Sequence, residues 1–385
     1  MSAHLLEPLI IPAADPTPIL GNLERAIAGQ ATYLPLPEAD PQRADLLSTS
    51  QRVGEPIDAT VALVVATSGS TGTPKGAQLT AANLVSSADA THTALGGPGH
   101  WLLALPAHHI AGIQVLVRSL IAGVTPLCLD LRGGFDVSAF ARGAARLAAT
   151  GERTYTSLTP MQLLKAMDTL EGIEALRSFD AILVGGGPTS AQTLHAADRL
   201  RIRVVTTYGS SETSGGCVYS GRPIPGAHIH VAEPTGRIYL AGPMIAAGYR
   251  NHPDHEAFSH PGWFATSDAG TLSDAGVLTV SGRLDAVIDT GGLKLHPEIL
   301  EEQMRAVTGV AQACVVGIPD PRLGQAVVAA YTGTATPTDI LAALEDLPRW
   351  QLPKQLLRVP ELPATALGKT DRAAVGKLFT ANGQR

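Results

Sequence analysis

The sequence predicts an α/β protein with a large N-terminal domain and a small C-terminal domain. Short β-branched runs alternate with amphipathic stretches over residues 61–209, which is typical of parallel strands joined by helices. From about residue 227 short strands and turns predict a β-rich subdomain, and a new strand–helix pattern follows near residue 285. Because 385 residues exceed one ordinary core, we expect two domains, residues 1–284 and 285–385.

In the first domain, apolar runs predict buried strands, and the amphipathic stretches between them predict helices. The strands are expected at 61–66, 125–129, 181–187 and 203–209, and the helices at 136–149 and 189–200. The longest apolar region, 110–131, contains Arg118 and Pro126, so it predicts a buried helix and a strand rather than a membrane span. Binding residues are expected at the carboxyl ends of the parallel strands.

The C-terminal domain has an α+β pattern with clear helix starts. Pro297 precedes a first turn rich in glutamate, which suits the positive end of a helix dipole. Thr336 with Asp339 predicts a second helix start. Residues 313–319 and 326–332 are apolar and read as strands between these helices.

Composition excludes several classes of function. The net charge is −6, and no basic cluster is present, so nucleic acid is not an expected partner. The cysteines Cys128, Cys217 and Cys314 lie far apart, which argues against disulfides and structural zinc and for reduced thiols. The N-terminal residues show no secretory signal pattern, so we expect a cytoplasmic protein.

The stretch TSGSTGTPKG at residues 67–76 is the strongest functional signal. It follows the apolar run 61–66 and precedes a helix that Thr80 can cap. Glycines let backbone N–H groups turn toward an anion, and a lysine supplies positive charge, so this loop predicts phosphate binding. It is not a Walker A motif, and a plain Ser/Gly linker is the alternative. The candidate phosphate ligands are Thr67, Ser68, Gly69, Ser70, Thr71, Gly72 and Lys75.

Two further candidates follow expected strands. Glu212 could bind Mg²⁺, because a hard cation bridging phosphates prefers carboxylate oxygens. Tyr208, at the start of the same element with Gly209, Ser210 and Ser211, could stack on a nucleobase. The glycine turn at Gly186, Gly187 and Pro188 does not fit the GxGxxG fingerprint, so a Rossmann dinucleotide site is disfavoured.

Asp268 and Arg283 are candidates for ribose contacts, since a carboxylate can accept hydrogen bonds from both hydroxyls and arginine is a fixed fork of donors. A surface ion pair is the alternative interpretation. His109 lies in an apolar run, where packing is the more common role for a histidine. Asp136, in the segment FDVS, suggests either an amine-binding aspartate or a helix cap, and its position after a strand favours the cap.

In this order, the elements resemble the acyl-adenylate-forming superfamily, which includes acyl-CoA synthetases, adenylation domains of peptide synthetases and luciferases. The resemblance covers roughly residues 61–372 and rests on TSGSTGTPKG, YGSSET, GWFATSDAG, GRLD and the C-terminal GK. It implies that the C-terminal domain is mobile and rotates about Asp285. The segment before the phosphate loop is shorter than in usual members, so we expect the N-terminal domain to be truncated at its start.

The resemblance also implies the cofactors and the site. ATP would bind through Lys75 and the hydroxyl loop, Mg²⁺ through Glu212, adenine against Gly186–Pro188, and ribose at Asp268 and Arg283. His109 would lie beside the acyl pocket. Lys369 would act in adenylation, after which a loop with Gly291, Gly292 and Lys294 would meet coenzyme A.

Within the superfamily, the chain looks most like the compact bacterial 2-succinylbenzoate–CoA ligases of menaquinone synthesis. The expected partners are a carboxylic acid, ATP and coenzyme A, with a homodimer possible. Arg222 or the loop 210–214 could bind a second substrate carboxylate. A carrier-protein acceptor and a nucleotide-binding regulator without catalysis are the other interpretations.

Overall fold

The computed structural model describes residues 3–67, 73–364 and 370–382. The chain splits into two compact units. The first comprises Met1–His230 and Tyr239–Ala265, and the second comprises Val231–Ile238 and Thr266–Arg385. The boundary expected between residues 284 and 285 marks a hinge. Because compact units do not locate a hinge, that boundary stays a prediction.

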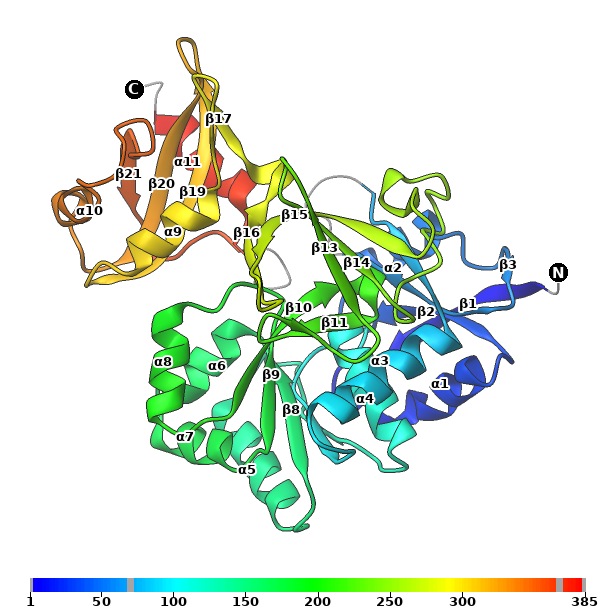
Figure 1. Cartoon of the computed structure of the whole chain (residues 1–385). Helices are drawn as coiled ribbons and strands as arrows, with labels where there is room; N and C mark the ends of the chain where they lie inside the picture. The colour runs from blue at the N-terminus through cyan, green and yellow to red at the C-terminus, as the bar shows by residue number, and fades with distance from the viewer. Residues whose placement is uncertain (1–2, 68–72, 365–369, 383–385) are drawn as a thin grey trace. The chain divides into compact units, whose positions relative to one another are not determined.

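Within the described part of the first unit, one sheet has the strand order β3-β1-β2-β4-β5 (Figure 1). Strand β2 is parallel to β1 and β4, whereas the edge strands β3 and β5 are antiparallel to their neighbours. Every residue of β2 is buried, as expected of a central strand. The strands are Ala3–Ile11 (β1), Thr32–Pro37 (β2), Pro56–Asp58 (β3), Val61–Ala66 (β4) and Gly76–Thr80 (β5), and the helices are Leu20–Ile27 (α1), Pro41–Ser50 (α2) and Ala81–Ala94 (α3).

Strand β5 corrects one expectation from the sequence. The prediction of a helix directly after the loop is wrong, because β5 intervenes and pairs antiparallel with β4. The prediction that Thr80 caps the helix is confirmed, since its Oγ1 accepts a hydrogen bond from the Asn83 N–H at 3.1 Å. The loop therefore closes between two paired strands, and phosphate contacts there cannot rest on a helix N-terminus.

A second sheet of the first unit, counted over the described residues, has the order β12-β11-β10-β9-β8-β6-β7. Its strands from β10 to β7 are parallel, as predicted, and β11 and β12 form an antiparallel edge. Strand β7 is shorter than the run 125–129 suggests. The strands are His100–Leu103 (β6), Leu127–Cys128 (β7), Thr154–Leu158 (β8), Ala181–Val184 (β9), Val204–Ser210 (β10), Gly215–Tyr219 (β11) and Arg222–Pro223 (β12).

Helices connect the parallel strands of this sheet, and each begins at a recognisable residue. Asp136 accepts a hydrogen bond from the Ala139 N–H at 2.6 Å, which confirms its interpretation as a helix cap. The predicted buried helix within 110–131 is confirmed as well. The helices are Ile110–Ile121 (α4), Val137–Ala148 (α5), Pro160–Met167 (α6), Leu170–Arg177 (α7) and Ala191–Arg199 (α8).

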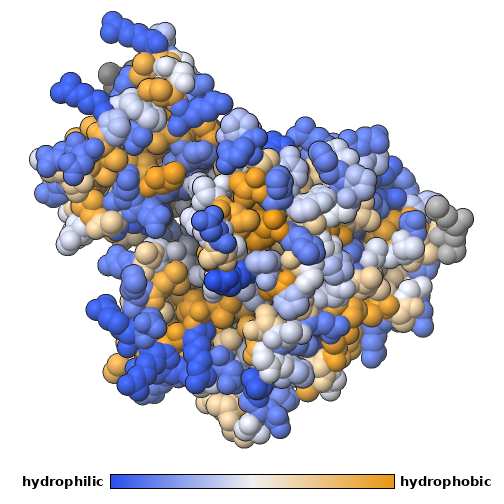
Figure 2. Space-filling model, viewed as in Figure 1, coloured by the Kyte–Doolittle hydropathy of each residue, from blue (hydrophilic) through white to orange (hydrophobic). Residues whose placement is uncertain are grey.

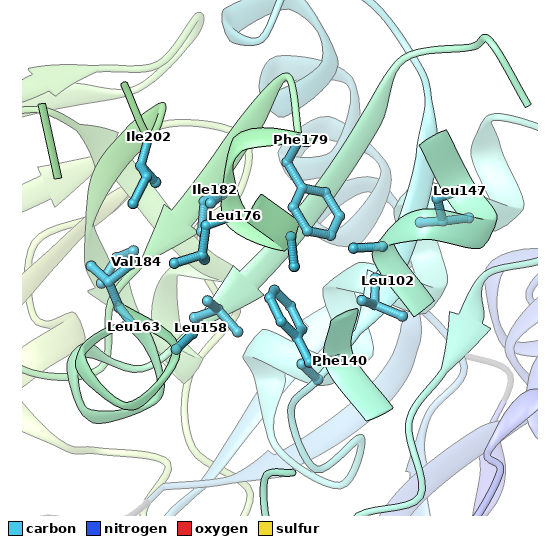
Figure 3. Packing of buried hydrophobic residues seen from close by; sticks show 14 of the residues in the cluster. Leu102, Phe140, Leu147, Leu158, Leu163, Leu176, Phe179, Ile182, Val184 and Ile202 are labelled. Carbon is cyan, nitrogen blue, oxygen red and sulfur yellow. The ribbon is translucent and has the colours of Figure 1, made fainter. Parts of the chain in front are cut away.

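A core of apolar side chains lies between helices α5 to α8 and the sheet (Figure 3). Phe140 of α5 and Phe179 stack with ring centroids 5.6 Å apart. Leu102, Leu158 and Ile182 contribute the sheet side of the cluster. Burial of such a cluster from water is the main favourable term that holds the parallel strands and their helices together.

The β-rich segment forms a sheet with the order β13-β14-β15-β16. Its strands confirm the β-rich segment predicted from about residue 227. They are His228–Ala232 (β13), Arg237–Ala241 (β14), Trp263–Leu272 (β15) and Leu278–Arg283 (β16). Short 3₁₀ helices occur at Thr17–Ile19 (η1), Ser211–Thr213 (η2), Glu256–Phe258 (η3) and Leu284–Ala286 (η4).

The described part of the second unit contains a sheet with the order β18-β17-β20-β19, and β21 pairs with β20. Alternate residues of β19 and β20 enter different cores. Val315 and Tyr331 lie in one cluster, and Cys314 and Val328 lie in the other. The elements are Ile288–Thr290 (β17), Leu293–Leu295 (β18), Pro297–Arg305 (α9), Val310–Asp320 (β19), Gly324–Gly333 (β20), Pro337–Ala343 (α10), Gln355–Arg358 (β21) and Arg372–Asn382 (α11).

The structure bears on two expectations about the environment. Among the described residues, no helix combines the length and apolar character needed to cross a membrane. The three cysteines are free, and burial raises the pKa of each thiol to about 12. Cys217 and Cys314 are buried and Cys128 is half-buried, in agreement with thiols that lie inside the protein.

Adjacent leucines on α6 provide a test of the core. Leu163 is fully buried in the cluster of Figure 3, whereas Leu164 is 39% exposed. On the face shown in Figure 2, apolar areas are interspersed with hydrophilic ones, so partly exposed leucines are ordinary. We expect Leu163→Ala to lower the free energy of unfolding by about 2–5 kcal/mol, through lost burial and a cavity. Leu164→Ala should cost less than about 1 kcal/mol in the same urea titration. Equal costs would contradict the assigned core.

Candidate active site

The two ends of the predicted phosphate loop are held together by the backbone. The Thr67 N–H donates to the Lys75 carbonyl oxygen at 2.8 Å, directly beyond the pairing of Ala66 with Gly76. Ser68, Gly69, Ser70, Thr71 and Gly72 lie outside the described residues. The structure thus fixes the entrance and the exit of the loop at one end of the β4–β5 pair.

Residues 247–251 hold the exit of this loop, a role that sequence reasoning missed. The Arg250 N–H donates to the Gly76 carbonyl at 2.8 Å, and the Gly76 N–H donates to Asn251 Oδ1 at 3.1 Å. Asn251 Nδ2 in turn donates to the Pro74 carbonyl at 2.9 Å. These contacts join segments about 175 residues apart, so no local pattern in the sequence could have indicated them.

The side chain of Lys75 lies against the same distant segment. Its Nζ is 5.0 Å from the centroid of the Tyr249 ring and 3.1 Å from His255 Nε2. A cation over an aromatic face is attracted by the ring quadrupole. The phosphate-loop lysine is therefore held in a defined position before any ligand binds.

Glu212 is 7% exposed and lies on the 3₁₀ turn η2, which follows β10. Its Oε1 accepts a hydrogen bond from the Tyr249 hydroxyl at 2.5 Å, and its backbone carbonyl accepts one from the Ala246 N–H. Burial, together with the charge of Glu212, raises the pKa of Tyr249, so this hydroxyl remains a donor. The Tyr249 side chain thus contacts both Glu212 and Lys75.

The Glu212 carboxylate fits a single-carboxylate Mg²⁺ site. Among the described residues no hydrogen bond reaches its Oε2, so one oxygen is available to a cation. Over those same residues, no group of three or more His, Cys, Asp or Glu side chains could hold a metal. A Mg²⁺ ion that keeps several waters and binds substrate phosphates needs only one or two protein carboxylates.

The proposed adenine contacts lie at the carboxyl ends of neighbouring parallel strands. Gly186, Gly187 and Pro188 follow β9, and Tyr208 and Gly209 lie near the end of β10, which pairs with β9. Glycine is required at 209, because a Cβ there would lie 2.1 Å from the Gly215 carbonyl oxygen. Ser210 ends the strand and Ser211 follows it; the Ser210 N–H donates to Thr213 Oγ1 at 2.8 Å. The structure therefore brings the two predicted elements together.

Asp268 and Arg283 lie in the second unit. They face each other in the register of β15 and β16, with 3.9 Å between Oδ1 and Nη1. Arg283 also donates to both carboxylate oxygens of Asp285, at 2.7 and 2.5 Å. The arginine thus links the predicted ribose carboxylate with the predicted hinge residue.

The predicted coenzyme A loop is a tight hairpin between β17 and β18. Gly291 and Gly292 have φ values of +65° and +81°, and Thr290 pairs with Leu293. Positive φ at both central residues is the requirement of a type I′ turn, which explains the paired glycines. Lys294 is exposed on β18.

Lys369 lies outside the described residues, but both ends of its segment are anchored. Ala364 bridges to Thr370, and the Asp371 N–H donates to the Pro363 carbonyl at 2.8 Å. Arg372 then forms ion pairs with Glu301 at 2.5 Å and with Glu298 at 3.1 Å. These contacts position the start of α11 against α9.

His109 is the N-cap residue of α4, in the first unit. Its ring lies 4.0 Å from that of His108, whose pKa burial lowers to about 4. A neutral, half-buried His108 is consistent with a packing role for one of the two histidines. The role of His109 beside an acyl pocket stays a prediction.

Further along α4, sequence reasoning missed two buried polar side chains. Gln114 is fully buried, and neither of its amide atoms has a hydrogen-bond partner in the described part of the chain. Arg118, one turn later, is 3% exposed and stacks over Trp101 at 5.1 Å. No described carboxylate pairs with Arg118, and burial lowers its pKa. The sequence did contain a signal for these two residues, because they are polar side chains within an apolar helix.

The fold and site have clear counterparts among known proteins. The family model of AMP-binding enzymes matches residues 17–250, and that of the AMP-binding enzyme C-terminal domain matches residues 300–369. A probable 2-succinylbenzoate–CoA ligase of Mycobacterium tuberculosis is 46% identical over 96% of this chain and 98% of that protein. The 2-succinylbenzoate–CoA ligase of Listeria monocytogenes is 30% identical over 92% of this chain and 76% of its own length.

Among solved structures, the o-succinylbenzoate CoA synthetase of Bacillus subtilis, in complex with its acyl-adenylate intermediate, matches with a TM-score of 0.75. It is 24% identical, and the match covers 96% of this chain and 82% of that one. This likeness confirms the predicted fold.

The hydrogen bond between Tyr249 and Glu212 can be tested by removing one oxygen atom. We expect Tyr249→Phe to lower the free energy of unfolding by about 1.5–3 kcal/mol, because the buried carboxylate loses a charged hydrogen bond. The measurement is urea denaturation of both proteins. Tyr239→Phe is the matched control, since no hydrogen bond of its hydroxyl occurs among the described residues, and it should be nearly neutral. A neutral Tyr249→Phe would contradict the assigned contact.

Proposed function

Since this chain belongs to the AMP-binding enzyme family, we propose that it is an ATP-dependent 2-succinylbenzoate–CoA ligase working through an acyl-AMP intermediate. The similarity to ligases of this name over nearly the whole chain supports the substrate. The observation that carries the proposal is a buried arginine without an anionic partner, Arg118, which suits an acid with a second carboxylate.

In the first step, a substrate carboxylate oxygen attacks the α-phosphorus of ATP, and pyrophosphate leaves. Lys75 and the hydroxyl loop would hold the β- and γ-phosphates, and Glu212 would hold Mg²⁺. The ion would neutralise charge on the phosphate oxygens. Asp268 and Arg283 would orient the ribose, and Lys369 would neutralise charge on the reacting carboxylate. Positioning and charge neutralisation are the main sources of catalysis in phosphoryl-type transfers.

In the second step, the sulfur of coenzyme A attacks the acyl carbon, and AMP leaves. Rotation of the C-terminal domain about Asp285 would remove Lys369 and present the hairpin with Gly291, Gly292 and Lys294. Such gating would shield the mixed anhydride from water between the two steps. The free thiols of the chain support a cytoplasmic location, and a homodimer is expected from the family.

Arg118 is the residue we assign to the second carboxylate. A buried cation without a partner is strongly destabilising, so its retention calls for an anion that binds there. Gln114 lies one turn before it on the same helix, 3.5 Å from the Cβ position of Gly215, close in sequence to Glu212. Arg222, the expectation from sequence, lies exposed on β12.

The reaction itself is tested by incubating the protein with Mg·ATP, coenzyme A and a panel of acids. We expect a thioester with 2-succinylbenzoate, detected by mass, and none with benzoate, cinnamate, short fatty acids or amino acids. Lys369→Ala is the control, and it should abolish acyl-AMP formation while still converting preformed acyl-AMP. A thioester with another acid alone would overturn the substrate. Acyl-AMP without any thioester would point to a carrier-protein acceptor.

The role of Arg118 has its own test. Arg118→Met keeps an apolar stem of similar length, and we expect it to raise KM for 2-succinylbenzoate by about 30-fold or more, because a charged hydrogen bond is lost. KM for ATP should stay unchanged. Arg146→Met, on the exposed face of α5, is the control. An unchanged KM for the acid in the folded Arg118 variant would contradict the assignment.

A further inference from the structure

His255 makes two contacts through different ring nitrogens. Its Nδ1 accepts a hydrogen bond from the Ala257 N–H at 3.1 Å, which caps the short helix η3. Its Nε2 lies 3.1 Å from Nζ of Lys75. The ring also packs edge-on against Tyr249, with 5.0 Å between centroids. A residue 180 positions after the phosphate-loop lysine therefore lies beside its charged group.

The contact with Ala257 decides where the imidazole carries its proton. A nitrogen that accepts a hydrogen bond has no hydrogen, so in the neutral ring the proton lies on Nε2. Burial, and then the charge of Lys75, lower the pKa of His255, which favours the neutral ring. The nitrogen that faces Lys75 is thus an N–H donor.

Two hydrogen-bond donors that face each other cannot form a hydrogen bond. The ammonium of Lys75 and the Nε2–H of His255 converge on the same space, and neither provides an acceptor for the other. An anion with several oxygens satisfies both at once. Hydrogen bonds from such donors to a phosphate are charge-assisted and short.

We propose that His255 is a phosphate ligand of this site, donating from Nε2 to a terminal phosphate oxygen of ATP beside Lys75. The assignment rests on the proposed function, in which Lys75 binds the β- and γ-phosphates. It adds a ligand from the segment after Tyr249, which the sequence motifs do not contain. The Ala257 contact positions this ligand by fixing its tautomer.

The two nitrogens can be separated by substitution. Asparagine places its amide near Nδ1, so His255→Asn keeps a polar group for the cap but cannot reach Lys75. Glutamine places its amide nitrogen near Nε2, so His255→Gln keeps the donor and loses the cap. A residue that only stabilises η3 would tolerate asparagine better than glutamine. A phosphate ligand would show the opposite order.

The test is calorimetric titration of the full chain with Mg·ATP and, separately, with AMP. We expect His255→Asn to raise Kd for ATP about tenfold or more, which corresponds to one charged hydrogen bond, with Kd for AMP unchanged. His255→Gln should bind ATP within about threefold of the wild type. His252→Asn, which changes an exposed histidine three residues earlier, is the control and should bind both nucleotides normally.

Three outcomes would overturn the assignment. Wild-type affinity for ATP in His255→Asn would remove the role of Nε2. Weaker binding of ATP and AMP alike in both variants would indicate a structural role only. If the wild-type protein binds AMP but not ATP, Lys75 is not a phosphate ligand, and the proposed function fails together with this inference.

Discussion

The arrangement of the candidate site depends on the side chain of Tyr249. Its hydroxyl donates to the buried carboxylate of Glu212 at 2.5 Å, and its ring lies 5.0 Å from the ammonium of Lys75. A buried carboxylate needs a donor, and a partly buried cation gains from an aromatic face. One residue therefore contacts both charged groups. The groups that we propose for Mg²⁺ and phosphate are thus positioned before either ligand binds.

The parallel strands place the remaining groups around this centre. Strands β9 and β10 are paired in parallel, so Gly186 and Tyr208 emerge at the same edge of one sheet. Strand β4 ends at the phosphate loop, and β5 returns antiparallel to it. At the start of β5, Gly76 is hydrogen-bonded to Arg250 and Asn251. Hydrogen bonds from the Arg250 backbone and the Asn251 side chain thus hold the exit of the loop, while side chains that could meet a ligand come from strand ends.

Two arginines illustrate different uses of a charge in this protein. Arg372 is half-buried and pairs with Glu301 and Glu298, so its charge is compensated within the second unit and it holds α11 against α9. Arg118 stacks on Trp101 and pairs with no described carboxylate. An uncompensated charge is costly inside a protein. Ion pairs account for the first arginine, and our proposal assigns the second to an anionic ligand.

Sequence patterns alone predicted the α/β class, the parallel strands, the β-rich segment and the helix starts at Thr80, Asp136, Pro297 and Thr336. These follow from local periodicity and capping, which act over a few residues. The tertiary structure alone decided that β5 precedes the helix of Thr80, that Tyr249 joins Glu212 to Lys75, and that His255 faces the lysine. Contacts between residues 37 to 180 positions apart leave no local pattern, because folding rather than spacing brings those groups together.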